Sequence, residues 1–165
     1  MGCGLTLPAI DVRSYDAGLD GDALRALVVD HQDFHRALEA WPEGKAIVDV
    51  YVAFLETECA RHDGRILVAA LGGEVIGFIC VVASTRNDSP DDPAPFAWVH
   101  DVFVRPDRRG QGVGRSLLAA AETFARGQGA QTLRLGELDR NARARALYRV
   151  LGFRDYTRVL TKALS

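Results

Sequence analysis

The chain has 165 residues, of which 48% are hydrophobic and 25% are charged, and this composition suits one soluble globular domain with its own core. No apolar run reaches the roughly 18 residues that a membrane span needs, and residues 1–11 lack the basic start of a signal peptide, so we expect a cytoplasmic protein without a membrane partner. The net charge of −2 combines −10 over residues 1–104 with +8 over residues 105–165, and the basic half suits a small phosphorylated ligand.

Hydrophobic periodicity predicts the elements of the N-terminal third. A strand is expected over residues 6–13, followed by an amphipathic helix over residues 20–40 in which one break is allowed. The breaker Trp41-Pro42-Glu43-Gly44 separates it from a second helix over residues 45–61.

The remaining elements alternate between strands and helices. Two apolar strands over residues 65–71 and 74–83 flank Gly72-Gly73, which predicts a tight hairpin. Residues 84–95 are predicted to form a loop that contains Asp88, Asp91 and Asp92. These aspartates could attract a cationic substrate, but solvated side chains are more typical of such a loop. Next come a strand at 96–105, a helix at 112–126, a strand at 131–135, a helix at 141–151, and one or two strands within 153–163. This order predicts a mixed α/β (α+β) sheet.

Cysteines and histidines show no pattern of a disulfide framework or a metal site. Cys3, Cys59 and Cys80 are odd in number and widely spaced, and we expect the last two to be small core residues. His31 and His35 lie four residues apart on a predicted helix, and without a third ligand they indicate a polar helix face. We therefore expect no metal.

The most informative segment is the glycine-rich stretch at residues 109–115, which follows an apolar strand and a Pro-containing turn. Glycines let the backbone approach a ligand closely. The first N–H groups of a helix have no internal partner, and together with the helix dipole they can bind a pyrophosphate. Arg108, Arg109 and Arg115 would add positive charge around such a site.

Three other interpretations of this stretch compete. A P-loop would require Gly-Lys-Ser or Gly-Lys-Thr, which is absent. In a dinucleotide fingerprint, Gly110 and Gly112 fit the first two positions but Arg115 occupies the third. A plain glycine-rich turn with solvated arginines is the third alternative, and the loop alone would favour it.

The surrounding residues carry a specific resemblance. Residues 109–114, Arg-Gly-Gln-Gly-Val-Gly, resemble the acetyl-CoA pyrophosphate loop of the GNAT N-acetyltransferases, with Arg109, Gly112 and Gly114 at the defined positions of Arg/Gln-x-x-Gly-x-Gly/Ala. Residues 141–153 resemble the second signature of that family, an Asn followed seven residues later by Tyr and then by Gly-Phe. The resemblance covers roughly residues 65–160.

The resemblance implies one N-acetyltransferase domain over residues 1–165, with residues 1–64 on the acceptor side and residues 65–165 as the acetyl-CoA-binding core. It implies a mixed, mostly antiparallel sheet of six to seven strands flanked by about four helices, with acetyl-CoA as co-substrate. The implied cofactor-binding residues are Val102, Phe103, Val104, Arg109, Gly110, Gln111, Gly112, Val113, Gly114, Arg115, Asn141 and Tyr148.

Two residues of the second signature have implied roles. Tyr148 would give a proton to the departing CoA thiolate, and a modest shift would suffice because a phenol has a pKa near ~10 and a thiol near ~8.5. Its structural alternative is packing of the last helix against the sheet. Asn141 would cap the last helix, contact the cofactor arm, or do both.

The general base is left open by the sequence. Where relatives often carry a carboxylate, this chain offers Trp98, His100 and Asp101. His100 has the best intrinsic pKa for a base, and a partly buried structural role is its alternative. On a regular strand His100 and Trp98 would share a face, and Asp101 would point to the opposite one.

The predicted function is direct transfer of an acetyl group from acetyl-CoA to a primary amine of a small molecule or peptide, in a ternary complex. We expect no nucleic-acid partner, because the aromatic residues of the basic half sit at core-like positions, and a homodimer is common in the family. Trp41 and Tyr51 could line the acceptor pocket, although ordinary packing is the favoured interpretation. The alternative function is a non-catalytic acyl-CoA-binding regulatory module.

Overall fold

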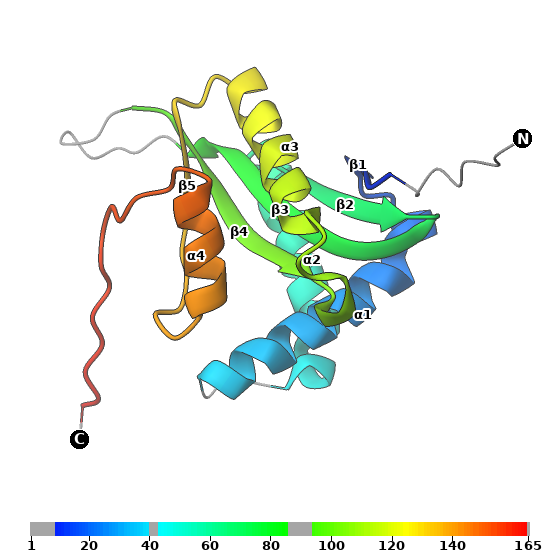
Figure 1. The fold of residues 1–165 in the computed structure, drawn as a ribbon, viewed down its shortest axis with the longest axis horizontal. Helices are drawn as coiled ribbons and strands as arrows, with labels where there is room; N and C mark the ends of the chain where they lie inside the picture. The colour runs from blue at the N-terminus through cyan, green and yellow to red at the C-terminus, as the bar shows by residue number, and fades with distance from the viewer. Residues whose placement is uncertain (1–8, 40–42, 86–93, 165) are drawn as a thin grey trace, which may run out of the picture.

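The computed structural model describes residues 9–39, 43–85 and 94–164, and in that part five strands form one sheet (Figure 1). The strands lie in the order β1-β2-β3-β4-β5, and only the β4–β5 pair is parallel. Their bounds are β1 Asp11–Ser14, β2 Arg65–Leu71, β3 Glu74–Thr85, β4 Phe96–Val104 and β5 Thr132–Leu135. The helices are α1 Ala17–Leu38, α2 Gly44–Arg61, α3 Val113–Gly127 and α4 Ala142–Val150, and a 3-10 turn η1 spans Pro106–Arg108. The predicted mixed, mostly antiparallel class is confirmed.

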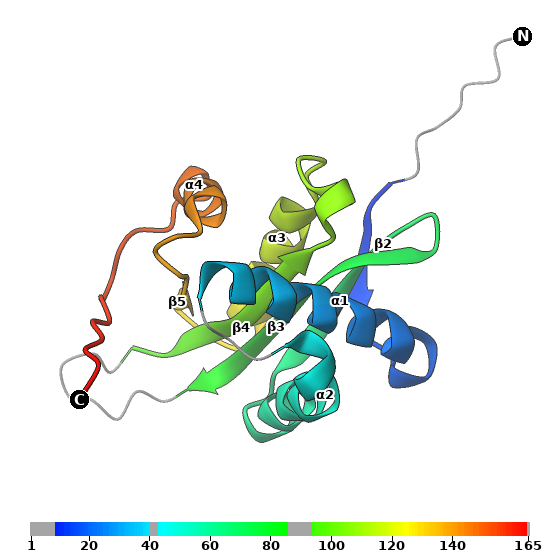
Figure 2. The same ribbon diagram turned by 90° about the horizontal axis from the view of Figure 1, so that it is seen from below.

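The sheet is covered on both faces. Helices α1 and α2 lie on one side, and α3 lies on the other (Figure 2). Side chains of β3 alternate between the two layers, because Phe78 packs with α1 and α2 whereas Ile79 packs with α3. The sequence of a strand buried on both faces is a continuous apolar run. For this reason β2 and β3 could be predicted although their residues do not alternate between apolar and polar. Within the described residues, no helix is both long and apolar enough to cross a membrane.

Helix α1 is continuous, so the allowed break does not occur. It begins at Asp16, whose carboxylate accepts hydrogen bonds from the N–H groups of Gly18 (2.8 Å) and Leu19 (3.1 Å). Such a cap satisfies donors that have no partner inside the helix. The apolar stripe of Leu24 and Val28 then packs on the sheet.

Gly44 marks the place where α2 starts against α1. A Cβ built at Gly44 would lie 2.5 Å from the carbonyl oxygen of Val29, and its N–H donates to Asp33 Oδ1 at 3.0 Å. The helices would have to separate to admit a methyl group. We expect Gly44→Ala to lower the free energy of unfolding by about 1–3 kcal/mol in urea titrations. Gly127→Ala is the matched control, because no atom lies within 4 Å of its built Cβ; equal stability of both variants would contradict the close contact.

An extra residue in β4 changes which side chains face the helices. Cys80 of β3 pairs with Asp101, but Val81 pairs with Val99, so His100 is a β-bulge. Val99 therefore packs on the α3 side, whereas Phe103 packs on the α1–α2 side. Odd-numbered side chains of β4 therefore face α3 before the bulge and face α1 and α2 after it.

The bulge overturns the expectation that His100 and Asp101 point to opposite faces. His100 Nε2 lies 3.4 Å from Glu58 Oε2 of α2. Asp101 Oδ2 accepts a hydrogen bond from the Tyr51 hydroxyl of the same helix at 2.8 Å. Consecutive residues can share a side at a bulge because the regular alternation is interrupted there.

The strand count differs from the predicted six to seven, because residues 153–164 form no strand. Their large apolar side chains occur at spacings of three, one and four rather than two, so an extended chain would have no consistently apolar face. Tyr156, Val159, Leu160 and Leu164 are 60–91% exposed. The segment runs away from the sheet toward the C-terminus (Figure 1).

Candidate functional site

A cavity of about 730 Å³ lies where β4 and β5 separate. Strand β5 pairs with β4 only as far as Val99, so among the described residues no strand pairs with this edge of β4 from His100 to Val104. Predicted site residues that line the cavity are His100, Asp101, Val102, Phe103, Val104, Arg109, Gly110, Gly112, Gly114, Arg115, Asn141 and Tyr148. Two predicted residues do not line it: Gln111 donates to the Asp107 carbonyl at 3.4 Å, and Val113 is buried in the α3 core.

The glycine loop begins α3 at one end of this cavity. Gly112, the residue before the helix, has φ +87°, a left-handed conformation that a side chain would strain. Because Gly112 has no side chain to cap the helix, the first N–H groups of α3 stay available at the cavity wall. With Arg115 exposed at the rim, this end can hold an anion.

Arg109 points back toward the sheet. Its Nε donates to the Val104 carbonyl at 2.9 Å, and its guanidinium lies 4.9 Å from the ring centroid of Phe34 and 5.2 Å from that of Phe103. Both distances suit cation–π contacts. The glycine loop is therefore tied to α1 as well as to β4. Arg108 turns away to Glu74, 3.6 Å from its carboxylate, so it does not add charge to the loop as expected.

A buried polar network forms another part of the cavity wall. Asp101 is 7% exposed, and besides the Tyr51 hydroxyl it faces His31 Nε2 at 3.4 Å. Burial raises the pKa of Asp101. Burial, together with the charge of Arg109, lowers the pKa of His31 to about 4, so His31 is neutral near pH 7.

The interpretation of His31 and His35 as a polar helix face is wrong. His31 is 3% exposed and packs edge-on against Phe103, and both histidines line the cavity. The sequence did carry a signal, because His31, Phe34 and His35 continue the stripe of Leu24 and Val28 at spacings of three and four. Tyr51 lines the cavity and belongs to the Asp101 network, so the favoured interpretation of ordinary packing is wrong for this residue.

Tyr148 lies on α4, the helix that follows β5. Asn141 caps this helix, as predicted, by accepting from the Ala144 N–H at 3.3 Å. Glu137, a residue that the sequence interpretation missed, lines the same cavity as Tyr148 and accepts a hydrogen bond from Asn141 Nδ2 at 3.0 Å. Burial, and then the Glu137 carboxylate, raise the pKa of Tyr148. This shift is opposite to one that would match the phenol to a thiol.

Cys59 and Cys80 meet on the α1–α2 side of the sheet. Both are free, their Sγ atoms are 3.6 Å apart, and Cys80 is fully buried as a core residue should be. Across residues 9–39, 43–85 and 94–164, no group of three or more His, Cys, Asp or Glu side chains could hold a metal ion. Several residues discussed above lie outside the described ranges, namely Cys3, Trp41, Asp88, Asp91 and Asp92.

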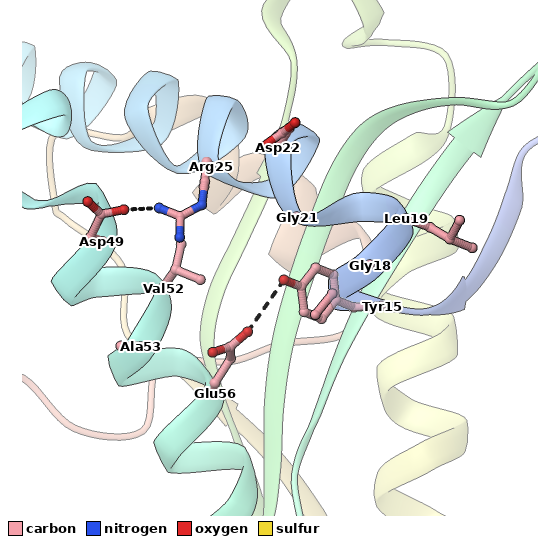
Figure 3. A pocket seen from close by; sticks show the side chains of 11 residues that line it. Tyr15, Gly18, Leu19, Gly21, Asp22, Arg25, Asp49, Val52, Ala53 and Glu56 are labelled. Atoms are coloured by element: carbon pink, nitrogen blue, oxygen red, sulfur yellow. Dashed lines mark hydrogen bonds and ion pairs between the residues drawn. The ribbon is translucent and has the colours of Figure 1, made fainter.

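A smaller cavity of about 320 Å³ lies between α1 and α2 (Figure 3). Two interactions cross it: Arg25 pairs with Asp49, and the Tyr15 hydroxyl donates to Glu56 at 3.4 Å. It shares no lining residue with the larger cavity. The glycine loop, Asp101 and Tyr148 therefore all belong to the larger one.

Comparison with known proteins agrees with this geometry. The model of the acetyltransferase (GNAT) family matches residues 26–153. The chain is 30% identical to the uncharacterized N-acetyltransferase YhfO of Bacillus subtilis (strain 168), over 84% of this chain and 86% of that protein. It is 29% identical to an aminoglycoside N(6')-acetyltransferase type 1 of Stenotrophomonas maltophilia, over 74% and 78% of the two chains.

The fold has solved counterparts. The structure of aminoglycoside N-acetyltransferase AAC(6')-Iy in complex with CoA superposes with a TM-score of 0.71 over 95% of each chain, at 21% identity. At this identity the likeness shows the fold alone, and the evidence from the sequence comes from the family match. Since the matched residues 26–153 include both the glycine loop and the Asn141–Tyr148 helix that meet in one cavity, the chain belongs to the GNAT family of acetyltransferases.

Proposed function

We propose that the protein transfers an acetyl group from acetyl-CoA to a primary amine of a small molecule or peptide, by direct attack in a ternary complex. The observation that carries this proposal is the single cavity that joins an anion-binding helix start, an unpaired strand edge, a buried carboxylate and the Tyr148 hydroxyl. A reaction between a bound thioester and a bound amine gains most of its rate from such positioning.

The cofactor would lie along the glycine loop and the free edge of β4. The pyrophosphate fits the first N–H groups of α3 near Arg115. The Arg105 N–H donates to the Ile76 carbonyl of β3 at 2.9 Å. Because successive N–H groups of a strand point to opposite sides, the Val104 N–H faces the free edge of β4. There it would hydrogen-bond the thioester carbonyl and stabilise the negative charge that develops on it.

The amine would enter on the side of α1 and α2. We place the base role on Asp101 rather than on His100, because the Asp101 carboxylate is held by Tyr51, whereas His100 is turned toward Glu58 and Phe54. Ionised Asp101 with a raised pKa is a better proton acceptor than an ordinary aspartate. Among the described lining residues, the only carboxylates are Asp101 and Glu137, which fits a compact amine better than a polycation.

Isothermal titration with acetyl-CoA tests the cofactor site directly. We expect micromolar binding by the wild type and a rise in Kd of at least about 100-fold in the Arg109→Glu, Gly112→Asp double variant. The aspartate would place a negative charge at the helix start, and the glutamate would remove the donor to the Val104 carbonyl.

Arg126→Glu, in the last turn of the same helix, is the control for the change of charge. It should bind like the wild type. Absence of binding by the wild type would contradict the acyltransferase proposal at its first step.

A further inference from the structure

The two oxygens of the Asp101 carboxylate have different surroundings. Oδ2 accepts the hydroxyl of Tyr51 at 2.8 Å, which is the only hydrogen bond donated to this side chain among the described residues. Oδ1 lies 3.4 Å from His31 Nε2, beyond the ordinary N–H···O range of about 2.7–3.2 Å. Each carboxylate oxygen has two lone pairs. Oδ1 is therefore the oxygen that can accept a proton from a ligand in the cavity.

Both partners of this hydrogen bond are held in place by the fold. The ring of Tyr51 packs against the core between α2 and the sheet and lies 5.9 Å from the ring of Phe54. The bulge at His100 turns Asp101 toward α2, and its side chain is buried. A phenylalanine at position 51 would keep this packing and lose only the donor.

We propose that Tyr51 is a positioning residue for the acetylation of the amine: its hydroxyl holds Oδ2 of Asp101, so that Oδ1 takes the proton of the amine. This inference rests on the proposed function. As the amine nitrogen attacks the thioester carbonyl, an N–H bond breaks, its electron pair stays on nitrogen, and its proton forms an O–H bond with Oδ1. Asp101 then gives this proton to water. The departing thiolate takes the proton of Tyr148, which water replaces.

The same hydrogen bond favours the ionised form of Asp101, which is the form that a base needs. Burial raises the pKa of Asp101, and the hydrogen bond from Tyr51 opposes that rise. Burial, together with the charge of Asp101, raises the pKa of Tyr51. The hydroxyl therefore keeps its proton and remains a donor over the whole pH range of an activity assay.

The other titratable groups around Asp101 are neutral near pH 7. Burial lowers the pKa of each of the three histidines, and a thiol and a phenol have ordinary pKa values above about 8. Arg109, a cation that acts on His31, is directed to the Val104 carbonyl. The directed stabilisation of the carboxylate therefore comes from Tyr51. The neutral groups are His31 and His35 of α1, Cys80 of β3, His100 of β4 and Tyr148 of α4.

The pH profile of kcat tests this role, by thiol release from acetyl-CoA with an accepted amine. In Tyr51→Phe, the acid limb of the profile should move to higher pH by about one pH unit, because the carboxylate loses the donor that favours its ionised form. On that limb kcat should fall about 10-fold, and most of the loss should disappear on the plateau. Equal loss of kcat at every pH would overturn the proposal, because it would indicate a structural defect.

A stronger donor at the same position should have the opposite effect. Fluorine lowers the pKa of a phenol, so 3-fluorotyrosine incorporated at position 51 should move the acid limb to lower pH. Tyr15→Phe is the matched control, because the Tyr15 hydroxyl donates to Glu56 of the same helix outside the larger cavity. Its profile should match that of the wild type.

Direct titration of Asp101 by NMR does not depend on any amine. In protein labelled with 13C at the aspartate carboxyl carbons, the Asp101 resonance is identified by its loss in Asp101→Asn. Tyr51→Phe should raise the pKa of Asp101, and Tyr15→Phe should leave it unchanged.

The two measurements separate the inference from the proposed function. An unchanged Asp101 titration in Tyr51→Phe would overturn the role of Tyr51 even if the protein acetylates amines. A protein that binds acetyl-CoA and acetylates no amine would contradict the proposed function, whatever the titration shows.

Discussion

Replacement of Tyr148 by phenylalanine is expected to lower kcat at least about 100-fold and to leave the Kd for acetyl-CoA within about twofold. The hydroxyl is needed only as the thiolate departs, whereas the ring keeps its packing against Phe153. Initial rates measured by thiol release and titration calorimetry with acetyl-CoA would give the two quantities on the same preparation.

Tyr15→Phe is the matched control for the loss of one hydroxyl. Tyr15 lines the smaller cavity between α1 and α2 and should affect neither rate nor binding. Wild-type turnover in Tyr148→Phe would exclude the acid role. Binding of acetyl-CoA with no turnover in any form would instead favour a regulatory acyl-CoA-binding module.

Asp101→Asn should have the second large effect, a fall in kcat of roughly 10²- to 10⁴-fold. The amide keeps an oxygen for the Tyr51 hydroxyl but cannot accept the proton of the amine. In the wild type, kcat should rise with pH through the raised pKa of Asp101, because the base must be ionised. That rise should be absent in the variant.

Thermal melts between pH 4 and pH 8 separate this chemical role from a structural one. The pKa of Asp101 is higher in the folded than in the unfolded chain, so the unfolded chain loses the proton first and wild-type stability falls as the pH rises between the two values. Asp101→Asn removes that fall and should melt no lower than the wild type at pH 8. Asp49→Asn, on the exposed face of α2, is the control. A strongly destabilised Asp101→Asn variant would assign Asp101 to the core instead.

The cofactor end of the site could be predicted because its determinants are local. Residues 109–114 place glycines where a strand gives way to a helix, and Gly112 does adopt the left-handed conformation that opens α3. Asn141 caps α4 through its own side chain, three residues from its partner. Interactions of this range are encoded within one segment, so a short motif suffices to identify them.

The acceptor end could not be predicted in the same way. His31, Tyr51 and Asp101 come from three separate elements, and their contact depends on how α1 and α2 cross the sheet. The bulge at His100 depends on the pairing of β3 with β4, which no periodicity in one strand reveals. Glu137 was missed because it lies outside both signatures, four residues before Asn141.

The prediction of a strand within residues 153–163 is wrong for a related reason. A strand forms only where an edge accepts it and a face can be buried, and the side chains of Val159 and Leu160 remain almost fully exposed. The strand propensity of the residue types in 153–163 was therefore not enough to form a strand.

The bulge in β4 also governs how relatives should be aligned. Because Cys80 pairs with Asp101 and Val81 pairs with Val99, removal of the unpaired residue would leave both of its neighbours on their present faces. A relative with one residue fewer at this point would therefore still present its carboxylate to α2. In an alignment, the gap belongs opposite His100, and the residue to compare with Asp101 is the one that follows the gap.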